Sequence, residues 1–146
     1  MRKFVFQLES VLEYRQNMED HEKNLLGRAV QKALAEEQSL DKLSLKRQQH
    51  LTACKSSEVN LTFIHQQEVH LQYIEAKINQ SQEKLIEAKK KVKIHKRSLV
   101  DASKKRKMIE KIREKRLQEY RRDLAKEEQG ILDEAGIAAY CRNNKG

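Results

Sequence analysis

The clearest potential for metal chemistry in this sequence lies in His50 and Cys54, which stand four positions apart. On a helix this spacing places both side chains on one face, where they would supply half of a zinc site. An antiparallel helix would have to add the other ligands near positions 63–67, where His65 is the one candidate. The other histidines are isolated and are interpreted as seam or surface residues: His21, His70 and His95. The sequence therefore predicts no bound metal.

Catalytic motifs are missing from the sequence, which has no glycine-rich phosphate loop and no nucleophile elbow. With no Trp, three Phe and four Tyr among 36% charged residues, the chain has too few large apolar side chains for a globular core of ordinary size. Cys54 and Cys141 do not form a Cys-x-x-Cys pair and are expected to be free thiols. We therefore expect a protein that is not an enzyme and needs no cofactor.

The positive charge of the chain is concentrated in one segment. Residues 84–126 contain 18 lysines and arginines against six aspartates and glutamates, whereas the flanking segments are nearly neutral. Such a segment could neutralise the phosphates of a nucleic acid, but Tyr120 is its one aromatic residue for base stacking. It also lacks the tryptophans and the wide apolar face of an interfacial membrane helix. A solvated face or a protein contact is favoured, with nucleic acid and anionic membrane as alternatives.

Apolar residues recur at alternating steps of three and four along nearly the whole chain, and the chain contains no proline. This heptad pattern predicts two long amphipathic helices that pack along a seam. The first seam, with a stutter after Ala29, consists of Phe4, Leu8, Val11, Arg15, Met18, Glu22, Leu25, Ala29, Ala33, Glu36, Leu40, Leu43, Arg47, Leu51 and Cys54. The second consists of Leu71, Ile74, Ile78, Ser81, Leu85, Ala88, Val92, His95, Leu99, Ala102, Arg106, Ile109, Arg113, Arg116 and Tyr120.

Short polar residues that compete for backbone hydrogen bonds cluster between the two seams, which predicts a turn there. The expected fold is all-α, a two-helix antiparallel coiled-coil hairpin forming a single elongated domain. Its parts are a first helix over 1–55, a bend over 56–62, a second helix over 63–135 and a mobile tail over 136–146. A bend centred near Glu58 would place Phe4 opposite Arg113 and leave the chain after Arg116 as an overhang. The alternative is one unbroken helix that pairs with a second copy.

No signal peptide and no run of 18 apolar residues is present, so a cytosolic protein is expected.

Three segments resemble the FliJ family of the bacterial flagellar export apparatus. They are the opening residues 4–15 (FVFQLESVLEYR), the segment 64–78 after the bend (IHQQEVHLQYIEAKI) and the C-terminal Leu-Asp-Glu-Ala at 132–135. The tail departs from the family pattern, because Ala135-Gly136 replaces the usual helix continuation, and the last ten residues are expected to lack order. The resemblance covers essentially the whole chain.

The resemblance implies a non-enzymatic component of flagellar protein export, with a rod similar to the stalk subunit of rotary ATPases, required for flagellum assembly and motility. It implies as partners the hexameric export ATPase and its regulator, the cytoplasmic domain of the membrane export gate, and export chaperones. Location would be cytoplasmic and peripheral at the membrane through these partners. A central-stalk subunit of a rotary ATPase is the competing interpretation, although such subunits are generally larger.

Contact residues also follow from the family likeness, each with plain intramolecular seam as the alternative. Those expected to contact the ATPase ring at the joined termini are Phe4, Leu8, Leu12, Arg15, Tyr120, Leu124, Ile131 and Leu132. Those expected to contact the export gate in the half near the bend are Leu40, Leu43, Leu71, Ile74 and Ile78.

Overall fold

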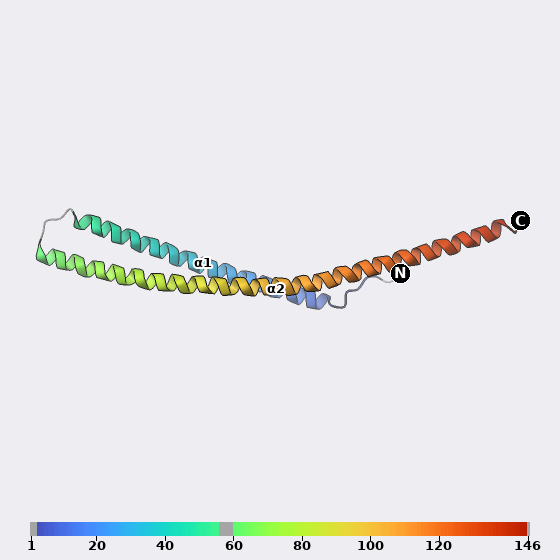
Figure 1. The fold of residues 1–146 in the computed structure, drawn as a ribbon, viewed down its shortest axis with the longest axis horizontal. Helices are drawn as coiled ribbons and strands as arrows, with labels where there is room; N and C mark the ends of the chain where they lie inside the picture. The colour runs from blue at the N-terminus through green and yellow to red at the C-terminus, as the bar shows by residue number, and fades with distance from the viewer. Residues whose placement is uncertain (1–2, 56–59, 146) are drawn as a thin grey trace. The chain divides into compact units, whose positions relative to one another are not determined.

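The computed structural model describes residues 3–55 and 60–145, and two long helices account for nearly all of them. Helix α1 spans Glu9–Cys54 and helix α2 spans Leu61–Asn143. They pack against each other as an antiparallel hairpin, and no strand occurs among the described residues (Figure 1). The expected all-α helical hairpin is confirmed. The chain divides into two compact units: the terminal unit, Met1–Glu19 with Ala102–Gly146, and the bend unit, Asp20–Asp101.

The bend unit is held together by the predicted seam. Ile74 and Ala88 are its most buried apolar residues, at 5% and 4% exposure, and the predicted α2 positions from Leu71 to Leu99 are all buried or half-buried. On α1 the stutter is present as expected, because both Ala29 and Ala33 are half-buried. Small residues at Ala29, Ala33 and Ala88 allow the two helices to approach each other closely at these points of the seam.

Asn60 begins the second helix. Its side-chain Oδ1 accepts a hydrogen bond from Thr62 N at 3.3 Å, and its backbone oxygen accepts the first helical bond from Ile64 N at 2.9 Å. This N-cap satisfies donors that the helix itself leaves unpaired. Helix α2 consequently starts at Leu61 rather than at the expected position 63, and α1 ends at Cys54. Residues 56–59, which make up most of the expected bend, lie outside the described part of the chain.

In the terminal unit, residues 3–8 are not helical. The helix expected from position 1 starts at Glu9, and a turn closed by Glu9 N and Phe6 O (3.2 Å) precedes it. The run Phe4-Val5-Phe6 consists of aromatic and β-branched residues, which favour extended backbone. Because an extended residue covers more than twice the length of a helical one, Phe4 reaches Tyr120 instead of the expected Arg113.

Helix α2 of the terminal unit continues beyond the point where other residues cover it. Leu124 is half-buried, and every described residue after it, 125–145, is exposed. The second helix was expected to end at 135, but it extends to Asn143. Alanines 135, 138 and 139 favour helix, Gly136 does not adopt a positive φ, and Arg142 Nε donates to Ala138 O at 3.3 Å. The overhang is thus a regular helix.

Two positions of the predicted α1 seam are shifted by one residue. Glu19 is buried where Met18 was expected, and His50 is half-buried where Leu51 was expected, with Met18 and Leu51 exposed. Neighbouring positions on a helix differ in direction by only about 100°, so the packing of the opposite helix decides which of the two turns inward.

Neither helix, within the residues described, contains an apolar stretch of the length needed to cross a membrane.

Candidate functional site

Aromatic rings gather where the N-terminal segment meets α2 in the terminal unit. The ring centroids of Phe4 and Tyr120 are 5.6 Å apart at an interplanar angle of 49°. Phe6 is 6% exposed, and the Arg116 guanidinium carbon lies 6.0 Å from its ring centroid. These contacts bring together Phe4 and Tyr120, two of the residues expected to bind the ATPase ring. Phe6, which the sequence interpretation left out of the seam, anchors the segment.

The other residues of the expected ring contact divide into internal and external positions. Leu12 is 3% exposed and therefore belongs to the packing of the terminal unit. Leu8, Arg15 and Leu124 are half-buried. Ile131 and Leu132 lie on the overhang and are 64% and 66% exposed, which leaves them available to a partner.

The overhang exposes two apolar residues that are not among the expected contacts with the ATPase ring. Ile137 and Tyr140 are 65% and 68% exposed, in addition to Ile131 and Leu132. Four large apolar side chains are thus exposed on different sides of an uncovered helix within ten residues, and such exposure is common where a protein contacts a partner. We call residues 131–140 the overhang surface.

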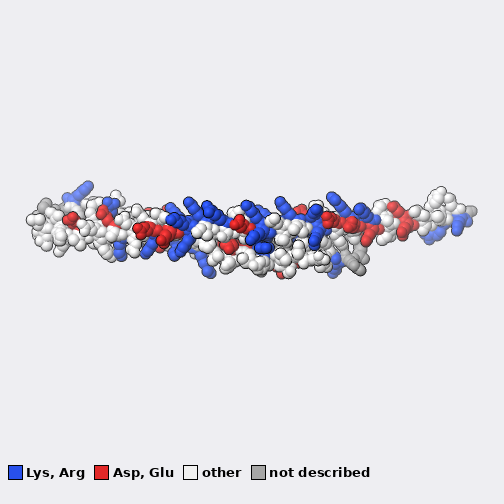
Figure 2. Space-filling view, turned by 60° about the horizontal axis from the view of Figure 1, so that its bottom comes forward, with Lys and Arg blue, Asp and Glu red and all other residues white. Residues whose placement is uncertain are grey.

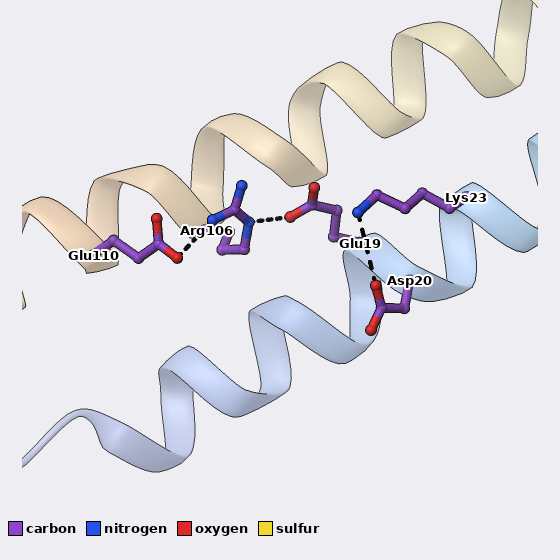
Figure 3. A network of polar contacts seen from close by, with 5 residues as sticks. All are labelled: Glu19, Asp20, Lys23, Arg106 and Glu110. Atoms are coloured by element: carbon purple, nitrogen blue, oxygen red, sulfur yellow. Dashed lines mark hydrogen bonds and ion pairs between the residues drawn. The ribbon is translucent and has the colours of Figure 1, made fainter.

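A buried ion pair joins the two helices of the terminal unit (Figure 3). Arg106 Nε donates to Glu19 Oε2, and Arg106 Nη1 donates to Glu110 Oε1 at 2.6 Å. The Glu19 side chain is 8% exposed and that of Arg106 is 22% exposed. Hydrogen bonding to Glu19, and secondly to Glu110, raises the pKa of Arg106 above its ordinary value. The arginine is therefore a fixed positive charge inside the seam.

In the bend unit an open pocket of about 460 Å³ lies between α1 and α2. Its lining consists of Leu43, Lys46, Gln49, His50, His70, Tyr73, Ile74 and Lys77. Lys77 Nζ is 5.1 Å from the Tyr73 ring centroid, and the rings of His50 and His70 meet edge to face at 4.7 Å. We call this the bend pocket.

The bend pocket includes two of the five residues expected to contact the export gate. Leu43 and Ile74 line it, whereas Leu40, Leu71 and Ile78 are half-buried and are not part of its lining. The sequence interpretation missed Tyr73 and Lys77, although their types gave a signal: a tyrosine and a lysine four positions apart share one helix face.

His50 and Cys54, the two potential zinc ligands considered in the sequence, lie close together in the bend unit. Cys54 Sγ lies 3.8 Å from His50 Nε2, but it also donates to Gln67 Oε1 at 3.4 Å. His50 Nε2 lies 3.2 Å from the backbone oxygen of Gln67, and His65 is exposed. Among the described residues, no three side chains of the metal-binding types gather closely enough to hold an ion. The cluster links the helix ends beside the bend.

The basic residues of segment 84–126 are exposed, with the exception of the half-buried Arg106. Figure 2 shows many lysine and arginine side chains on the visible face of the protein. Arg106 and Arg113 are the members of this segment that pair with carboxylates, Arg113 Nε lying 3.5 Å from Glu9 Oε2.

The chain was also compared with known proteins. A family model described as "Flagellar FliJ protein" matches residues 4–145. No curated protein and no solved structure gave a match. The match includes the opening segment, the segment after the bend and the Leu132–Ala135 motif, and it confirms the resemblance inferred from them. The chain therefore belongs to the flagellar FliJ protein family.

Proposed function

We propose that this protein, a component of the flagellar export apparatus, acts by binding rather than by catalysis. Its principal partner would be the hexameric export ATPase, whose ring assembly it would promote, together with the regulator of that ATPase. The cytoplasmic domain of the membrane export gate and export chaperones would be further partners. This places the protein in the cytoplasm, peripheral to the cell membrane at the base of the flagellum.

The observation that carries the ATPase proposal is the overhang surface. Exposed apolar side chains lose contact with water when a partner covers them, and each fully buried one contributes about 1.5–3 kcal/mol. Ile131 and Leu132 are adjacent on a regular helix and keep 64% and 66% of their surface. A helix with this composition fits a groove on a folded partner.

Replacing Ile131 and Leu132 together with serine is expected to weaken binding to the export ATPase by about a hundredfold, since two apolar anchors are lost. Stimulation of ATP hydrolysis by the purified protein, titrated against the ATPase, measures the effect. The matched control is Ile86→Ser with Ile94→Ser, because these residues are 55% and 59% exposed on the same helix but outside the overhang. Equal stimulation by both double variants would reject the ATPase contact on this surface.

The bend pocket is the proposed contact for the export gate. Its lining includes the apolar side chains of the half-buried Leu43 and the buried Ile74, together with the exposed Tyr73 and Lys77. A tyrosine supplies a large contact area with little loss of conformational entropy, which makes it a common anchor of protein interfaces.

Tyr73→Ala is expected to weaken binding to the cytoplasmic domain of the gate by about tenfold to a hundredfold, because it removes the main exposed aromatic side chain of the pocket. Tyr14→Ala is the matched control, since Tyr14 is 56% exposed against 57% for Tyr73 and lies in the terminal unit. Calorimetric titration of the gate domain with each variant measures the difference. A larger loss from Tyr14→Ala would contradict the proposed position of the gate contact.

A further inference from the structure

Helix α2 of the terminal unit carries a row of positive side chains along one face. The row consists of Lys104, Lys107, Lys111, Lys115, Arg122 and Lys126, which we call the basic row. Steps of three, four and seven residues keep these positions on one side of a helix. All six side chains are exposed, and at 1.5 Å per residue the row is about 33 Å long.

Charges of the basic row are not balanced within the protein. In the described part of the chain, no member of the row forms an ion pair, since the pairs of this segment belong to Arg106 and Arg113. Glu114, Glu119 and Asp123 flank the row on the same helix, which leaves three positive charges in excess. Like charges at helical spacing repel one another, so the row favours association with an anionic surface.

Exposed apolar side chains accompany the cations. Met108, which is 64% exposed, lies one turn after Lys104 and belongs to the same face. The bend unit shows the pattern independently: Lys89, Lys93 and Arg97 follow one another at four-residue steps. On their face lie two further apolar residues, Ile86 at 55% and Val100 at 51% exposure.

The combination fits a lipid surface better than a nucleic acid. A straight row on a regular helix matches a flat layer of headgroups, and isolated apolar side chains between lysines can enter the boundary of the acyl region. A nucleic acid duplex offers phosphates but no apolar layer, and stacking on single strands requires aromatic residues. Within the basic row there is none.

We propose that this face of α2 binds directly to anionic membrane lipids, with the lysines against phosphate headgroups and Met108 in the interface. Binding is electrostatic and reversible, because the apolar residues are too few to insert the helix. It decreases with ionic strength as the charges become screened. This contact is additional to the partner-mediated attachment in the proposed function, since it uses neither the overhang surface nor the bend pocket.

Co-sedimentation of the full-length protein with vesicles tests the proposal. Vesicles of phosphatidylcholine with about one third phosphatidylglycerol are compared with vesicles of phosphatidylcholine alone, at low and at physiological salt. The test variant replaces Lys104, Lys107, Lys111 and Lys115 with glutamine. Its control removes the same number of exposed cations elsewhere, at Arg28, Lys32, Lys42 and Lys55.

We expect binding to the vesicles that contain phosphatidylglycerol and none to those of phosphatidylcholine alone. The partition coefficient of the basic-row variant should be lower by about several hundredfold, since each of the four lysines near an anionic surface contributes about a fivefold factor. The control variant should retain most of the binding. Equal losses in the two variants would overturn the proposal, because net charge would then explain the attraction. Tighter row-dependent binding to duplex DNA or RNA at the same salt would also overturn it, in favour of a nucleic-acid surface.

Discussion

Replacing Arg106 with leucine is expected to lower the free energy of unfolding by about 2–3 kcal/mol. The substitution removes the arginine that pairs with Glu19, whose side chain keeps only 8% of its surface exposed. Removing one member of a buried ion pair costs much more than the pair itself contributes, because the remaining charge is then less well compensated. This loss is smaller than the roughly 3–5 kcal/mol that is usual for a fully buried ion pair, because the Arg106 side chain is still 22% exposed.

Arg113→Leu is the matched control for this prediction, because Arg113 lies two turns along α2 and pairs with Glu9. Both side chains of that pair are about half exposed, at 48% and 47%, so its loss should cost less than about 1 kcal/mol. The double variant Glu19→Leu with Arg106→Leu should recover most of the loss, since an apolar pair leaves no buried charge.

Urea unfolding followed by circular dichroism measures the three free energies. If Arg106→Leu and Arg113→Leu destabilise the protein equally, the buried position of Glu19 has no energetic consequence and the prediction is wrong. The ion pair does not depend on pH near neutrality. Glu19 and Glu110 raise the pKa of Arg106 from a value that is already strongly basic, so the positive charge of Arg106 is retained at neutral pH and is lost only as pH rises through that range.

Phe6→Ala should have the second largest effect, releasing the N-terminal segment from α2 at a cost of about 2–3 kcal/mol. Phe6 is 6% exposed although it precedes the helix, and its ring faces the Arg116 guanidinium. Without this anchor, the contact between Phe4 and Tyr120 is held by fewer neighbouring interactions. The first turns of α1 should then exchange their amide hydrogens faster.

Hydrogen exchange along α1 measures this release. The control is Val5→Ala, because the neighbouring Val5 is 78% exposed and its truncation should change stability by less than about 0.5 kcal/mol. Unchanged exchange at Leu12 and nearby residues in Phe6→Ala would show that the segment does not stabilise the start of the helix.

In the terminal unit, buried residues determine the stability of the fold, whereas exposed residues are available for binding a partner. Leu12 was expected to contact a partner, but it is only 3% exposed. A truncation of Leu12 would therefore reduce the stability of the fold, and any effect on binding would be indirect. Ile131 and Leu132, in contrast, are mostly exposed, at 64% and 66%. The proposed ATPase contact is therefore tested on the overhang, where a substitution leaves the packing intact.

The sequence could predict the α2 seam because its apolar residues keep a regular heptad phase. From Leu71 to Ile109 every predicted position is buried or half-buried. The same reasoning could not predict that Glu19 is buried in the seam. A glutamate gives no apolar signal in a heptad pattern, and its burial depends on Arg106 of the other helix. It also could not predict that Tyr73 and Lys77 border a pocket, because a pocket between helices depends on their spacing and register.

By itself the sequence determined that the chain is helical and which family it resembles, and it favoured a hairpin over one unbroken helix. Those properties depend on local spacing, on the exclusion of proline and on short motifs, all of which can be recognised without a partner helix. The tertiary structure alone decided which residue of each adjacent pair turns inward, how far the N-terminal segment reaches along α2, and where α2 becomes uncovered. These depend on contacts between residues far apart in the chain, such as Phe4 with Tyr120, and local periodicity contains no information about such pairings.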